Sequence, residues 1–249
     1  LFAKVEEKIE EGSNQNLKVL KVTVEEKATG EISAGFGVGT DGTAFLFSVK
    51  ENNWLGRGVK LTSTLDITET TVAGAISLNN PNYNYSGNSL FGSVSVASTD
   101  ESVSSSYKST KSGFSIGTEF EQYEDVYFSP ELTMALEDIE TDSTASAGIK
   151  KMEGDYTNID FIYALILDKR DLVYRPTEGY RVSFSQSLPI LQDRSSLMNG
   201  VNYDVFHDFS EDVIGTFKIH AKSIHGIDDD VRLTNRLLFS LFYSFKFCK

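Results

Sequence analysis

The chain has 249 residues, 40% of them hydrophobic, and its 36 acidic residues outnumber the 23 basic ones, giving a net charge of −13. This length suits one large or two small domains, and the acidic balance argues against nucleic acid as a partner, which would select for a basic surface. The one cysteine, Cys248, excludes an internal disulfide and a zinc cluster built on cysteines.

Apolar and polar residues alternate with period two from Glu31 onward. The clearest stretch is GVKLTSTLDIT, where Val59, Leu61, Leu65 and Ile67 fall on one face and polar residues on the other. This alternation is typical of half-buried strands. In chain order we predict eleven strands, near residues 31–38, 43–51, 58–68, 71–79, 88–97, 112–121, 127–139, 157–168, 180–189, 200–209 and 212–222.

The two faces of these strands differ throughout. The apolar face includes Val72, Ile76, Leu78, Leu90, Val94, Val96, Phe114, Ile116, Phe120, Leu132, Met134 and Leu136. The other face is rich in serine, threonine, glycine and acidic residues, among them Glu119, Glu131 and Glu137. We interpret the polar face as the wall of a hydrated lumen rather than as a catalytic pair of carboxylates, because no nucleophile or metal ligand set accompanies it.

Strand length and loop character favour a membrane barrel. Many segments run about nine to eleven residues, longer than the strands of most globular sheets and long enough to cross a bilayer at a tilt. Long polar connections at 100–110 and 141–154 roughly alternate with compact turns at 51–58, 79–87 and 168–179. We therefore predict an all-β fold, an antiparallel up-and-down transmembrane β-barrel with its long loops outside. A soluble β-sandwich, the alternative, has the same alternation.

Eleven strands are an odd number, whereas bacterial single-chain barrels usually close with an even one. An open barrel would leave unpaired backbone groups in lipid. The chain also opens at Leu1, without an initiator methionine, as a piece of a longer protein would. We therefore expect this sequence to be the front part of a larger barrel.

Two turns stand out. In DKRDLVYRPTEGYR (168–181), Pro176 restricts φ, Gly179 permits a positive φ, and Thr177 can bond its own backbone, which predicts a tight periplasmic reversal. Its charged residues, which can pair at the water-exposed rim, are Asp168, Arg170, Asp171 and Arg175. We expect this turn to shape the barrel rather than to have a direct functional role.

The other turn, NNWLGRG (52–58), contains Asn53, Trp54, Leu55, Gly56 and Gly58. A lone tryptophan between barrel strands suits an interfacial anchor, which we favour over packing against a neighbouring domain.

No motif indicates covalent chemistry. HExxH, GxSxG and GxxxxGK[ST] are absent, and the glycine-rich GFGVGTDG (35–42) has no lysine and continues into a strand. No apolar window of about 18 residues predicts a transmembrane helix. We expect no enzyme activity, no cofactor and no metal.

Four motifs in one order resemble the barrel-assembly proteins of the bacterial outer-membrane surface-antigen family. They are LKVLKVTVEEKATGEISAGFGVGTDG (17–42), NNWLGRG (52–58), NNPNY (79–83) and DKRDLVYRPTEGYR (168–181). The resemblance implies a sixteen-stranded barrel, fed by periplasmic POTRA domains, that folds and inserts other outer-membrane proteins.

The resemblance also implies domain boundaries. Residues 1–27 would be the tail of the last POTRA domain, and 28–223 would be about eleven of the sixteen strands. Residues 224–237 would begin an inward-folded loop. The tail 238–249, LFSLFYSFKFCK, fits no part of that loop and suggests a frameshift or a truncated gene.

In the resembling family, the first barrel strand closes weakly against the last, and a client strand pairs with its exposed edge. Here that lateral-gate strand would be EISAGFGVG, namely Glu31, Ile32, Ser33, Ala34, Gly35, Phe36, Gly37, Val38 and Gly39. Its glycines would weaken the strand, although they could instead only make room or bend the barrel.

The implied partners are the lipid bilayer, unfolded outer-membrane clients and assembly lipoproteins bound through POTRA domains, with the bacterial outer membrane as the location. A two-partner secretion or TamA-like translocation transporter of the same superfamily is the main alternative. A porin-like channel and a soluble binding module are less favoured.

Overall fold

The computed structural model describes residues 2–14, 17–39, 42–103, 105–210, 213–227, 231 and 242–248. Nearly all of its regular structure is β. The strands are β1 (Phe2–Glu11), β2 (Lys18–Glu26), β3 (Gly30–Gly39), β4 (Gly42–Trp54), β5 (Val59–Thr68), β6 (Thr71–Asn80), β7 (Ser89–Asp100), β8 (Tyr107–Tyr123), β9 (Val126–Thr141), β10 (Gly154–Asp168), β11 (Gly179–Gln192), β12 (Ser196–Ser210), β13 (Val213–Gly226) and β14 (Phe242–Cys248).

One short helix, α1 (Ala147–Lys150), lies between β9 and β10. Among the described residues, no helix has the length and apolar character that crossing a membrane requires.

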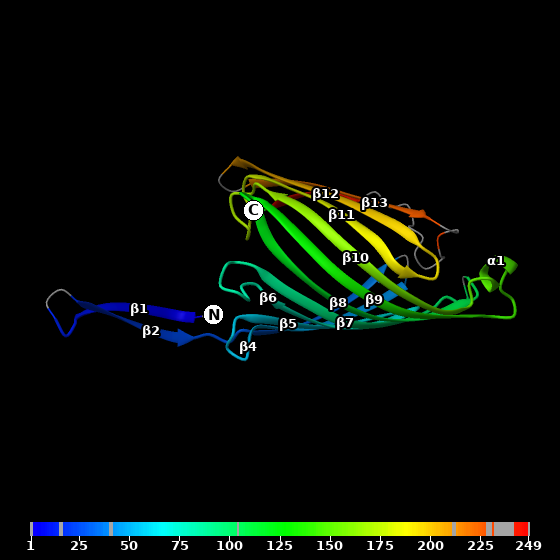
Figure 1. The fold of residues 1–249 in the computed structure, drawn as a ribbon, viewed down its shortest axis with the longest axis horizontal. Helices are drawn as coiled ribbons and strands as arrows, with labels where there is room; N and C mark the ends of the chain where they lie inside the picture. The colour runs from blue at the N-terminus through cyan, green and yellow to red at the C-terminus, as the bar shows by residue number, and fades with distance from the viewer. Residues whose placement is uncertain are drawn as a thin grey trace.

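Strands β3 to β14 form one sheet in which every strand pairs antiparallel with its neighbour in the chain. The sheet curves strongly, and within the described residues it remains open, with β3 and β14 at its two edges (Figure 1). The incomplete antiparallel barrel predicted from the sequence is therefore confirmed. Strands β3 to β13 correspond to the eleven predicted segments.

The tail adds a twelfth strand that the alternation count did not include. In β14, residues Phe242–Cys248 pair with His220–Ile214 of β13. Most of the expected inward-folded loop, 224–237, and residues 238–241 lie outside the described part of the chain.

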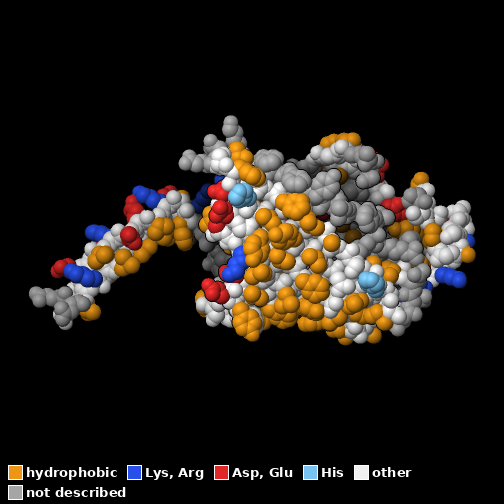
Figure 2. Space-filling model, turned by 90° about the horizontal axis from the view of Figure 1, so that it is seen from above, with side chains coloured by type: hydrophobic (Ala, Val, Ile, Leu, Met, Phe, Trp, Pro, Cys, Tyr) orange, Lys and Arg blue, Asp and Glu red, His pale blue; other side chains and the backbone are white. Residues whose placement is uncertain are grey.

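Within the described residues, the sheet lacks the hydrophobic core that a soluble protein would have. In the described chain only Ile139, Ala145 and Ile166 are buried hydrophobic residues. The predicted apolar face is instead exposed, and Figure 2 shows hydrophobic side chains gathered over it. Side chains of this face that are 37–52% exposed include Leu65, Ile67, Val72, Ile76, Leu78, Leu90, Val94, Val96, Phe114, Ile116, Leu132, Met134 and Leu136. A sandwich would cover this face with a second sheet, whereas a barrel leaves it to lipid.

The β1–β2 hairpin is a separate two-stranded sheet that projects from the barrel sheet (Figure 1). Because the strands alternate in direction, the turns 55–58, 81–88 and 169–178 lie at the hairpin end of the sheet. The connections 101–106 and 142–153 lie at the opposite end, where Figure 1 shows α1. The hairpin-end turns are not uniformly shorter, since 169–178 is nearly as long as 142–153.

Candidate functional site

Strand β3 presents an unpaired edge. It pairs with β4 on one side, from Gly30↔Glu51 to Gly39↔Gly42, and in the described chain it has no neighbour on the other. Among the barrel-strand side chains whose exposure the structure describes, its apolar ones are the most exposed, with Ile32, Phe36 and Val38 each 73% exposed. Such an edge offers free N–H and C=O groups to an added strand.

Two glycines in the middle of β3, Gly35 and Gly37, are not required by close packing. A Cβ at Gly37 would meet nothing within 4 Å, and one at Gly35 would meet only the Leu46 Cβ at 4.0 Å. The reading that these two glycines make room for a neighbour therefore has no contact to support it. In general, glycine lowers the stability of a strand, because it loses more conformational freedom on ordering and packs no side chain.

The 52–58 turn is organised by the side chain of Asn53. The side-chain Oδ1 of Asn53 accepts a hydrogen bond of 2.7 Å from the Gly58 N–H, and the backbone carbonyl of Asn53 accepts one of 2.9 Å from the Gly56 N–H. Positive φ is required at Leu55 (56°), Gly56 (69°) and Gly58 (69°). Leucine is uncommon in that region, so this turn holds backbone strain.

Trp54 ends β4 and is 42% exposed at the hairpin end of the sheet. A partly exposed indole at the rim is compatible with the predicted interfacial anchor, which stays a prediction.

The 169–178 loop is built around the carboxylate of Asp171. Its Oδ1 accepts from the N–H groups of Thr177 (3.0 Å) and Glu178 (3.1 Å), and its Oδ2 accepts from the Thr177 hydroxyl (2.6 Å). The Thr177 hydroxyl is the main cause that lowers the pKa of Asp171 to about 2. The segment is thus a folded loop rather than the tight reversal expected, and Thr177 bonds Asp171 instead of its own backbone.

The charged residues of this loop divide into different roles. Arg170 donates to Asp168 through Nε (2.7 Å) and Nη2 (2.5 Å), a bidentate pair with both side chains about 15% exposed. Arg181 lies 3.7 Å from the same carboxylate. Arg175 does not join them, since its guanidinium lies 5.6 Å from the Tyr174 ring centre. Lys169 instead pairs with Asp125 in the β8–β9 turn.

Gly179 closes the loop where β11 begins. Its φ is +96°, and a Cβ there would come within 3.0 Å of the Arg170 Cα and closer still to the Lys169 carbonyl oxygen. Both the backbone angle and the space therefore require glycine at this position.

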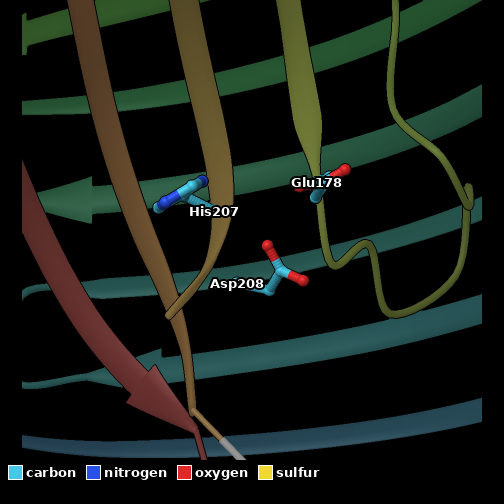
Figure 3. A group of neighbouring side chains, drawn as sticks. All are labelled: Glu178, His207 and Asp208. Atoms are coloured by element: carbon cyan, nitrogen blue, oxygen red, sulfur yellow. The ribbon is translucent and has the colours of Figure 1, made fainter. Parts of the chain in front are cut away.

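Sequence reasoning missed one cluster at the same rim. Glu178, His207 and Asp208 bring donor atoms within 4.8 Å of one another, all three exposed (Figure 3). The hydrogen bond with Asp208 is the main cause that raises the pKa of the Glu178 carboxyl. Exposed acidic groups gather in this way without an ion, so we assign no metal to the cluster. Because strand β12 and the 169–178 loop supply it together, no local motif could have revealed it.

The inner face is polar, as predicted. A cavity of about 360 Å³ lies against it, lined mainly by serine, threonine, amide and acidic side chains that include Glu131, Asn158 and Asp160. Glu137 is only 3% exposed on the same face. This composition suits a hydrated lumen wall.

Comparison with known proteins identifies the family to which this β-sheet architecture belongs. The model of the Omp85 superfamily domain matches residues 53–243. The chain belongs to the Omp85 superfamily. No curated protein matches its sequence. Family membership and fold together make this Omp85 chain a bacterial outer-membrane protein.

Among solved structures, the Omp85 chain resembles BamA from Haemophilus ducreyi lacking POTRA domains 1–3, with a TM-score of 0.74 and 18% identity. The likeness covers 91% of this chain and 47% of that one, so the chain spans about half the length of its relative. At this identity the likeness establishes the barrel fold.

Proposed function

We propose that the chain is the first part of the barrel of a BamA-type assembly factor, which inserts outer-membrane proteins by pairing their strands with β3. The observation that carries the proposal is the free edge of β3, a glycine-containing strand that directly follows the β1–β2 hairpin. Backbone groups, rather than a catalytic side chain, would recognise the client. Unfolded outer-membrane proteins would be the clients, and the bilayer would hold the sheet.

The exposed apolar side chains of the β1–β2 hairpin support the proposal that a POTRA domain lies on the periplasmic side. Val5, Ile9, Leu20, Val22 and Val24 are 44–69% exposed, and Figure 2 shows hydrophobic side chains along one side of the projecting hairpin. A two-stranded hairpin is not stable alone in water, so further protein would have to cover that stripe. We infer that residues 1–27 end a POTRA domain, and that assembly lipoproteins would bind through such domains.

Proline substitutions test the pairing. Gly35 and Phe36 are adjacent in β3, so their N–H groups point to opposite edges, and proline at each removes one of them. Alanine is the matched control, because a Cβ at Gly35 fits beside Leu46. We expect proline to slow assembly strongly at the position whose N–H faces the free edge, while alanine at either position has little effect.

Growth of a depletion strain carrying each variant measures assembly, together with heat-modifiable folding of a urea-unfolded eight-stranded barrel in vesicles. Equal activity of the proline and alanine variants at both positions would contradict strand pairing. Export of a soluble passenger without barrel insertion would favour the translocation alternative of the same superfamily.

A further inference from the structure

The two ends of β3 are secured differently. At the loop end, β3 stops at Gly39 and β4 begins at Gly42, so a short hairpin connection keeps the two strands together. At the other end, residues 27–29 join β3 to the β1–β2 hairpin, which belongs to a separate sheet. No turn closes this end, where the hairpin is attached to the first residues of an edge strand.

Half-buried Thr29, just before β3, is bonded to the end of β4 through both its backbone and its side chain. Its carbonyl oxygen accepts from the Asn52 N–H (3.2 Å) and from the Asn52 Nδ2 (2.9 Å). Its hydroxyl donates to Glu51 Oε1, which also accepts from the Asn53 N–H at 2.8 Å.

The β4 side of this contact leads directly into the ordered 52–58 turn. The ladder between β4 and β5 is irregular between Glu51 and Trp54, and the turn that follows is fixed by the Asn53 bonds described above. A Cβ at Gly30 would lie 3.3 Å from Glu51 Oε2, so the backbone of β3 passes close beside this carboxylate. Thr29 therefore bonds to two residues that lead directly into a hydrogen-bonded turn.

We propose that Thr29, Glu51 and Asn52 form a clasp that closes the otherwise open end of the β3–β4 pair. The clasp keeps β3 in register with β4 while the opposite edge of β3 stays free, and it isolates that edge from movements of the hairpin. These three are positioning residues, because they act through the β3 backbone. The inference rests on the proposed function, in which that edge receives the client strand.

The register of β3 can be measured directly in the full chain reconstituted in phosphatidylethanolamine–phosphatidylglycerol vesicles. In a Cys248→Ser background, spin labels at Glu31→Cys and Lys50→Cys report on the clasped end, since these residues are direct partners. Labels at Val38→Cys and Thr43→Cys report on the turn end.

We expect strong dipolar broadening from both label pairs. Thr29→Val combined with Asn52→Ala removes the hydroxyl and amide bonds and should open the clasped end roughly tenfold more often. Its broadening should fall while that of the turn-end pair is retained. Thr29→Ser keeps the hydroxyl and should behave as the parent, as should Thr99→Val in β7, far from the clasp. Unchanged broadening in the double variant, or equal loss in Thr99→Val, would overturn the clasp.

The same variants then link register to insertion of the urea-unfolded eight-stranded barrel. The double variant should insert this client several-fold more slowly, with Thr29→Ser restoring the rate. A loosened clasp with normal insertion would overturn the positioning role, provided that a proline variant of β3 still blocks insertion. If the proline variants insert normally too, the proposed function fails instead, while the clasp geometry remains as measured.

Discussion

Replacing Gly179 by alanine should destabilise the barrel more than the same change at other glycines with positive φ. Alanine in the left-handed region costs about 1–2 kcal/mol. At Gly179 (φ +96°) the new Cβ would also press on backbone atoms of Lys169 and Arg170, which cannot rotate away. Such overpacking adds about 1–3 kcal/mol, giving a total of about 2–5 kcal/mol.

Two matched variants separate these contributions. Gly56 has φ +69° and open space around it, so Gly56→Ala should cost only about 1–2 kcal/mol. Gly37 has neither a positive φ nor a neighbour within 4 Å, so Gly37→Ala should stabilise by about 0.5–1 kcal/mol.

Urea titration in vesicles, followed by the fluorescence of the sole tryptophan, Trp54, gives the midpoints for this series. The expected order of stability is Gly37→Ala, parent, Gly56→Ala, Gly179→Ala. If Gly179→Ala unfolds at the same urea concentration as Gly56→Ala, with the same slope, the close approach at the loop is not what selects glycine there.

Met134→Lys on the lipid face should lower the free energy of unfolding by about 2–4 kcal/mol. Thr133→Lys on the polar face should be tolerated. Equal urea midpoints for the two variants would contradict the assignment of faces. Arg170→Lys keeps the charge beside Asp168 but loses the bidentate geometry and should cost about 1 kcal/mol, with Arg170→Ala costing about 2–3 kcal/mol as the comparison. The lowered pKa of Asp171 stabilises the 169–178 loop fully above its unfolded pKa of about 4, and this contribution is lost as pH falls toward about 2. The protection of the Thr177 and Glu178 amides, measured as their hydrogen-exchange rates relative to the intrinsic rate at each pH, should therefore fall over that range, and Asp171→Asn should remove this pH dependence of the protection.

Local patterning predicted the loop chemistry only in part. Proline and glycine in the 168–181 segment correctly indicated a reversal, and Gly179 has the positive φ expected of it. The role of Asp171 was not predictable, because its partners lie six and seven residues along the chain and meet it only once the loop has folded. Arg175 looked equivalent to Arg170 in sequence, yet it lies over Tyr174 instead of a carboxylate.

The sequence by itself determined the two faces of the sheet, the order and direction of its strands and the family to which it is similar. These follow from a period of two and from short motifs, both of which are local properties of the chain. Only the tertiary structure decided which residues meet across strands: Thr29 with Glu51 and Asn52, Glu178 with Asp208, and β14 with β13. Such contacts depend on strand register and sheet curvature, which arise from all the strands together and leave no mark in any one segment.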